Sequence, residues 1–112
     1  MNITERTNGN VTILDLAGKI ELGEGDVQLR RKIDELTENH KVNVLINLAE
    51  VSYIDSAGRG ELVRTWTTLR RAGGAAKLLG LTKRISDLLT ITKLLVVFDS
   101  FENEDAAIAT FS

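Results

Sequence analysis

Apolar and β-branched residues open the chain in two short stretches, residues 3 to 6 and 11 to 16, separated by Thr-Asn-Gly-Asn. An Asn-Gly pair between two such stretches favours a β-hairpin, because both residues accept the positive φ of a tight turn. We therefore expect two antiparallel strands at the start of the fold. Gly18 should end the second strand, and residues 19 to 25, which contain two more glycines, should form a loop.

A helical pattern follows over residues 26 to 38, with Asp26 as the expected N-cap. Its apolar residues recur at the spacing that places them on one face of a helix, namely Leu29, Ile33 and Leu36. Charged residues occupy the other positions and are most simply solvated. Two i,i+4 ion pairs are expected among them, Arg30 with Asp34 and Arg31 with Glu35.

Strand and helix patterns then alternate to the end of the chain. Residues 41 to 48 are almost continuously apolar, as in a central strand that is covered on both faces. The next helix has an apolar stripe that ends before Gly73 and Gly74, and consists of Leu62, Val63, Trp66 and Leu69. Residues 75 to 79 should form a short strand.

Two capping residues mark the last two helices. Thr82 is the expected N-cap of the third helix, and Asn103 that of a terminal helix. The apolar residues 96 to 98 should form the last short strand between them. The inward residues of the terminal helix should be Ala107, Ile108 and Phe111.

This order of elements predicts an α/β fold. Crossovers between consecutive strands are right-handed, so the later strands should be parallel. We expect a mixed, mostly parallel sheet that opens with an antiparallel N-terminal hairpin and is covered by about four helices. At 112 residues, without an internal repeat or a linker, residues 1–112 should form a single domain.

Composition narrows the classes of function. The 14 basic and 16 acidic residues give a net charge of −2, and no basic block is available to neutralise phosphates, so direct nucleic-acid binding is disfavoured. The absence of cysteine and the single histidine exclude disulfides and the usual zinc ligand sets. Neither a secretion signal nor an apolar run long enough to cross a bilayer is present, so we expect a cytoplasmic protein without a membrane partner.

The most specific stretch is VSYIDSAGRGELV, residues 51 to 63, where a strand hands over to a helix. Functional residues concentrate at such places in α/β sheets, and Asp55 and Ser56 occupy this one. A phosphate on Ser56 would meet the unpaired N–H groups and the positive end of the helix dipole. Because Asp and Ser are also the preferred N-cap residues, a helix cap alone could explain both.

Small residues distinguish this stretch from an ordinary cap. Ala57, Gly58 and Gly60 keep bulk away from the Ser56 hydroxyl. Glycine early in a helix costs about 1 kcal/mol relative to alanine, which suggests that something approaches the backbone closely.

Catalysis by the chain itself lacks the necessary residues. A nucleophilic serine needs a base, and His40 lies in the turn after the first helix. The acids are spread over helix faces, and the Gly-rich segments match neither a P-loop nor a dinucleotide-binding pattern. We therefore expect no enzymatic activity, no metal site and no cofactor.

The residues VSYIDSAGRGEL resemble the signature of STAS domains of the anti-sigma-factor antagonist type, in which Asp-Ser and a small residue precede Gly-Leu-Gly. The resemblance extends over the chain, through the hairpin, the segment Leu-Ala-Gly-Lys-Ile-Glu at residues 16 to 21, and the final helix that begins Asn-Glu-Asp. It implies the STAS fold.

The resemblance also implies a regulatory cycle. The unphosphorylated protein would bind an anti-sigma factor that is also a serine kinase, and would thereby release a sigma factor. That kinase would phosphorylate Ser56, and a serine phosphatase would restore it. The partner would contact the motif residues, which are Asp55, Ser56, Ala57, Gly58, Arg59 and Gly60. The protein itself would be a monomer or a weak dimer.

Two residues depart from the pattern of this family. Arg59 stands where leucine is most common, so it either alters partner choice or is a solvated helix residue. Lys93 stands where glycine is common, and should affect only how the third helix ends. Other STAS proteins are small subunits of lipid-transport ATP-binding-cassette systems, cytoplasmic parts of anion transporters or stressosome components. A lipid-transport subunit or a stressosome-type scaffold is therefore the alternative function.

Overall fold

The computed structural model describes residues 1–93 and 96–111 and contains one five-stranded sheet in the order β1-β2-β3-β4-β5. β1 and β2 are antiparallel, and every later neighbour is parallel. This arrangement confirms the mixed α/β sheet with an N-terminal hairpin. The strands are β1 (Asn2–Asn8), β2 (Val11–Ile20), β3 (Asn43–Ile54), β4 (Ala75–Leu79) and β5 (Ser100–Phe101).

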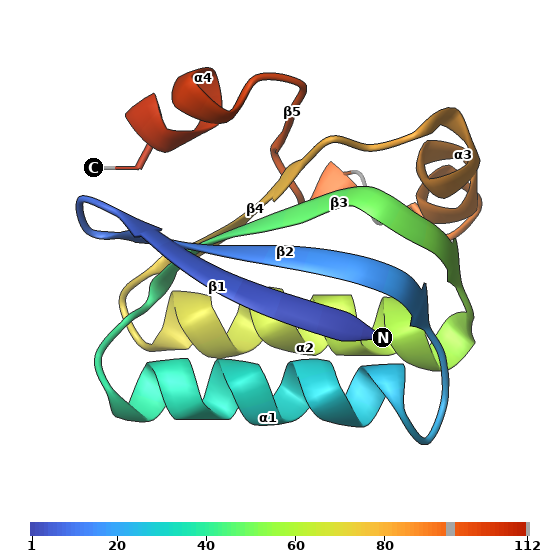
Figure 1. The fold of residues 1–112 in the computed structure, drawn as a ribbon, viewed down its shortest axis with the longest axis horizontal. Coiled ribbons are helices and arrows are strands. Elements are labelled where there is room, and N and C mark those ends of the chain that lie inside the picture. The colour runs from blue at the N-terminus through green and yellow to red at the C-terminus, as the bar shows by residue number, and fades with distance from the viewer. Residues whose placement is uncertain (94–95, 112) are drawn as a thin grey trace.

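Four α-helices in the described part of the chain cover the sheet. α1 and α2 lie side by side against one face, α4 lies on the opposite side, and α3 packs near the bent end of β3 (Figure 1). Their bounds are α1 (Gly25–Glu38), α2 (Ser56–Arg71), α3 (Lys83–Ile91) and α4 (Glu104–Ala109). Thr82 and Asn103 cap α3 and α4 as predicted, since each accepts a hydrogen bond from a backbone N–H of the first turn.

Alternation along the strands divides the core between the two faces. Leu14, Leu16, Val44 and Ile46 pack with α1 and α2, whereas Ile13 and Leu45 pack with Ala107 of α4. All of these side chains are buried. The nearly continuous apolar run of β3 therefore reflects a strand that is covered on both faces.

β2 is longer than the sequence indicated. Gly18 does not end the strand but lies inside it with φ +109°, beside an irregularity in the β2–β3 register, and pairing resumes to Ile20. The strand continues beyond Gly18 because Lys19 and Ile20 pair with β3. The local sequence pattern contains no information about this long-range pairing. Asp26 is likewise not the N-cap of α1, because the helix begins at Gly25 and Asp26 is buried in its first turn.

The predicted last strand is wrong. Val96 and Val97 are exposed, and only Phe98 of that stretch is buried. The strand lies further along, where Ser100 and Phe101 pair with the end of β4. Apolar character alone could not locate it, since a two-residue strand is defined by its partner and not by its composition.

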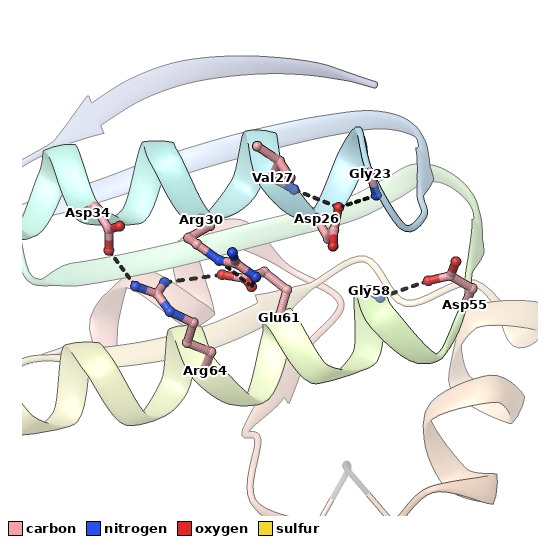
Figure 2. A network of polar contacts seen from close by, with 9 residues as sticks. All are labelled: Gly23, Asp26, Val27, Arg30, Asp34, Asp55, Gly58, Glu61 and Arg64. Atoms are coloured by element: carbon pink, nitrogen blue, oxygen red, sulfur yellow. Dashed lines mark hydrogen bonds and ion pairs between the residues drawn. The ribbon is translucent and has the colours of Figure 1, made fainter.

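Burial and ion pairing on α1 and α2 differ from the prediction. Val63, predicted to face the core, is 37% exposed, while Glu61 is buried at 3%. The expected pair of Arg30 with Asp34 is not found among the described residues. Arg30 instead binds Glu61 of α2, and Asp34 binds Arg64 of α2 (Figure 2).

Candidate functional site

The carboxyl ends of β2 and β3 lie next to each other, because Ile20 pairs with Ile54 in the parallel register. The segments that follow these strands are residues 21–26 and 55–60, which we call the junction. Each segment contains the start of a helix, α1 in the first case and α2 in the second. The junction therefore brings together residues that are more than thirty positions apart, at the edge of the sheet where α/β proteins place functional groups.

Asp55 joins the two segments through its carboxylate. Oδ1 accepts a hydrogen bond from the Gly58 N–H at 2.8 Å, and Oδ2 accepts one from the Leu22 N–H at 3.0 Å. Figure 2 shows the first of these at the start of α2. Hydrogen bonds from the N–H groups hold the pKa of Asp55 below its usual range, with the larger effect from Leu22 and the smaller from Gly58. The carboxylate therefore stays charged at neutral pH. Asp55 is thus the N-cap that its residue type predicted, with a second task in the junction.

Two glycines allow the helix starts to pack on β2. A Cβ on Gly58 would overlap the carbonyl oxygen of Ile20, and it would also lie 2.8 Å from Ile54 Cγ2. A Cβ on Gly25 would lie 2.8 Å from Ile20 Cα. The sequence suggested that something approaches the backbone closely at these glycines. At Gly58 the approaching group is the backbone of β2 in the same chain. Gly60 differs, because a Cβ there would meet nothing within 4 Å.

Ser56 is the first residue of α2 and is exposed. Among the described residues, none forms a side-chain hydrogen bond with its hydroxyl. His40 follows the far end of α1, a helix of 14 residues that spans about 20 Å, so the one imidazole is remote from Ser56. Ser56 is exposed to another protein, and its hydroxyl forms no hydrogen bond with a base within the described part of the chain; the Asp55 carboxylate bonds Leu22 and Gly58 instead.

The remaining motif residues differ in access. Ala57 and Arg59 are half-buried, Gly60 is exposed, and Gly58 is buried, which gives Gly58 a structural role. Arg59 donates a hydrogen bond from Nη1 to the carbonyl oxygen of Ile54 at 3.3 Å. Its guanidinium thus lies against the end of β3, immediately before Asp55.

Sequence reasoning missed Leu22. The side chain is 76% exposed, although it belongs to the segment that Asp55 holds in place. It also lines a cavity of about 340 Å³ together with Met1, Lys19, Glu21, Glu24 and Gly25. The local pattern predicts a plain loop over residues 19 to 25 and does not indicate that this segment lies beside the Asp-Ser motif. Extension of β2 to Ile20 would have revealed it, because parallel neighbours end at the same edge.

Other classes of site find little support in the described residues. Across residues 1–93 and 96–111, no group of three or more His, Asp or Glu side chains is placed to hold a metal ion. Within the same residues, no helix is both long and apolar enough to cross a membrane.

Residues 2–107 match the model of the STAS domain family. The anti-sigma-B factor antagonist of Bacillus subtilis (strain 168) is 34% identical over 99 residues, which cover 88% of this chain and 89% of that protein. A relative of the same description from Listeria monocytogenes is 34% identical over 98 residues, covering 84% of this chain and 81% of its own.

Solved structures share the fold at low sequence identity. An anti-sigma factor antagonist from Mycobacterium paratuberculosis superimposes with a TM-score of 0.85 at 16% identity, covering 98% of this chain and 92% of its own. The antagonist SpoIIAA in its unphosphorylated form superimposes with a TM-score of 0.74 at 17% identity, covering 96% of each chain. SpoIIAA of Bacillus is also known in a phosphorylated form, with the same TM-score.

Proposed function

The chain belongs to the STAS domain family, and from that premise we propose that it is an anti-sigma-factor antagonist controlled by phosphorylation of Ser56. In this proposal the unphosphorylated protein binds an anti-sigma factor that is also a serine kinase, and a sigma factor is released. The relatives named anti-sigma-B factor antagonist support the role, since they match this chain over most of their length.

The observation that carries the proposal is the placement of Ser56. Its hydroxyl is exposed at the first residue of α2 and follows Asp55, the residue that organises the junction. Because no base forms a hydrogen bond with its hydroxyl among the described residues, Ser56 is better suited to be modified than to act as a nucleophile. We therefore assign the chemistry to the partner kinase and expect no enzymatic activity of this chain.

Charge explains how the modification would act as a switch. A phosphate adds about −1.5 to −2 charges at neutral pH. It would stand next to the Asp55 carboxylate, whose lowered pKa keeps it ionised. A docking surface that fits the unmodified junction would then carry repulsion and a larger desolvation cost, so the phosphorylated protein should release its partner.

Further elements of the cycle follow from this role. A serine phosphatase would restore the hydroxyl, and the protein would act in the cytoplasm beside the transcription machinery. Partner contacts would involve the exposed and half-buried motif residues, with Gly58 shaping the backbone beneath them.

Phosphorylation of the chain in the presence of its cognate kinase tests the proposal. The purified protein and the anti-sigma factor from the same organism would be incubated with ATP and Mg²⁺, and the modified residues mapped by mass spectrometry. We expect phosphate on Ser56 and none on a Ser56→Ala control. Phosphorylation elsewhere, or none under conditions in which the kinase is active, would contradict the proposal.

A further inference from the structure

We propose that Leu22 is an apolar anchor for the partner that recognises Ser56, and that Asp55 acts as the positioning residue that holds it beside that serine. This inference rests on the proposed function and specifies the surface by which the partner is bound. Leu22 lies outside the Asp-Ser motif, in the segment that follows β2.

The exposure of Leu22 is the first step. Its side chain is 76% exposed, while its neighbours Glu21, Gly23 and Glu24 present polar atoms or no side chain at all. An isolated exposed leucine is ordinary on a protein surface. This one differs because its backbone is bound to the residue that precedes the predicted phosphorylation site.

The segment around Leu22 is held in place at successive positions. The Leu22 N–H donates to Asp55 Oδ2 at 3.0 Å, and the Gly23 N–H donates to Asp26 Oδ1 at 2.8 Å. The Asp26 N–H in turn donates to the carbonyl oxygen of Glu21 at 3.1 Å. An apolar side chain on a backbone that is already ordered loses less entropy on binding, which is a property of effective interface anchors.

Continuity with Ser56 identifies the occupant. Asp55 bonds both to Leu22 and to the first turn of α2, so a partner that covers Ser56 meets the residue 22 segment as part of the same surface. The surroundings of Leu22 are polar and carry both signs of charge: Glu21 and Lys19 are exposed, and Glu24 lies 3.9 Å from the N-terminal ammonium group. The surface therefore fits a protein that covers Ser56 and offers an apolar pocket with a polar rim, in keeping with interfaces in which a buried anchor is ringed by polar contacts.

Calorimetric titration with the cognate anti-sigma factor tests the anchor. We expect Leu22→Ala and Leu22→Gln each to raise Kd by about tenfold or more, as loss of an interface hot spot does. Ile91→Ala is the matched control, because Ile91 is 78% exposed at the end of α3 and lies outside the junction. Leu22 variants that bind like the wild type, or an equal loss in the control, would overturn the assignment.

The role of Asp55 is tested by two further measurements. In Asp55→Asn the amide group cannot accept both hydrogen bonds, so the Leu22 amide should lose protection from hydrogen exchange. The Gln28 amide, bonded to the Glu24 carbonyl oxygen in α1 at 2.9 Å, should keep its protection. The double variant Leu22→Ala/Asp55→Asn should lose less affinity than the sum of the two single losses, because part of the effect of Asp55 acts through the position of Leu22. Unchanged exchange at Leu22, or fully additive losses of affinity, would contradict the positioning role.

The outcomes separate this inference from the proposed function. A wild-type chain that neither binds the cognate anti-sigma factor nor is phosphorylated by it removes the proposed function and this inference with it. A wild-type chain that binds and is phosphorylated at Ser56, while the Leu22 variants keep full affinity, removes the inference alone.

Discussion

The carbonyl oxygen of Ile20 occupies the space that a side chain on Gly58 would need. β2 and α2 thus touch backbone to backbone in the first turn of α2, two residues after Ser56. The Asp55 N–H donates a hydrogen bond to the same carbonyl oxygen at 3.3 Å. One oxygen atom of β2 therefore binds the residue that follows β3 and also packs against the first turn of α2. This contact determines where Ser56 stands relative to the segment that contains Leu22.

Gly58→Ala should therefore destabilise the protein. The added methyl group would force the start of α2 away from β2, and overpacking of this kind costs about 1–3 kcal/mol. Gly60→Ala is the matched control, since its methyl group would enter open space and alanine favours a helix by about 1 kcal/mol over glycine. Urea unfolding of both variants would check this, and equal stabilities would contradict the role of the contact.

Asp55→Asn should reduce stability at neutral pH but not in acid. The pKa of Asp55 is lowered by its hydrogen bonds in the folded protein, so the carboxylate stabilises the fold above its ordinary pKa of about 4 and loses this effect as pH falls further. Unfolding curves at about pH 7, 5 and 3 should show a wild-type advantage that shrinks only at the lowest of these values. An advantage that is independent of pH would show that the charge is irrelevant.

Each of the two arginines that bind Glu61 should compensate for substitution of the other in the free energy of unfolding. The Glu61 side chain is 2% exposed, and its oxygens accept hydrogen bonds from Arg30 and Arg64, each at 3.1 Å in its shortest contact. Both arginines are themselves partly exposed, so Arg30→Met or Arg64→Met alone should cost about 1 kcal/mol or less. The double variant leaves a buried carboxylate unpaired and should cost about 2 kcal/mol or more.

A thermodynamic cycle from urea unfolding would measure that coupling. Arg31→Met serves as the control, because Arg31 is exposed on α1 and contacts none of these residues through an ion pair in the described structure. Strictly additive costs would mean that the two arginines act independently.

Substitutions at Ser56 should separate the two forms of the proposed switch. Ser56→Asp adds negative charge beside Asp55 and should weaken binding to the cognate anti-sigma factor. Ser56→Ala should bind like the unmodified protein and resist inactivation by the kinase with ATP. Calorimetry of both variants provides the comparison, and equal affinities would argue against an electrostatic switch.

Lys93→Gly should stabilise the protein. Lys93 follows the C-cap residue Thr92 of α3 and has φ +59°, a left-handed conformation that costs a non-glycine residue about 1 kcal/mol. Glycine should recover part of that cost, partly offset by its greater freedom in the unfolded chain. A midpoint of thermal unfolding no higher than that of the wild type would contradict this account. The prediction that Lys93 affects the end of the third helix agrees with this geometry.

Local chemistry was sufficient for several parts of the fold. The Asn-Gly pair predicted the hairpin, and Gly9 has φ +61° in its turn, but the second turn residue is Asn10, since Asn8 still pairs with Val11 at the end of β1. Asp55, Thr82 and Asn103 were recognisable as caps because a short side chain with an oxygen satisfies a free N–H wherever it precedes a helix. The order of elements predicted the mixed α/β sheet, whereas the STAS fold was implied by the resemblance to that family and is supported by the family match.

Contacts between segments that are distant in the sequence could not be predicted from local patterns. The end of β2 beyond Gly18 exists because β3 pairs with it, and Arg30 chooses Glu61 over Asp34 because α2 lies beside α1. Neither choice changes the hydrophobic pattern of the segment concerned. Local pattern could therefore place each helix without revealing which charges it would share with its neighbour.

The chain alone was enough to show that Asp55 and Ser56 stand at the start of a helix, since capping depends on residues within one turn. Only the tertiary structure shows that Leu22 lies beside Asp55. Their hydrogen bond joins residues 33 positions apart, and it forms because β2 and β3 end side by side. Hydrogen bonds act over a few ångströms regardless of separation along the chain. A motif of adjacent residues is thereby turned into a surface made from two segments.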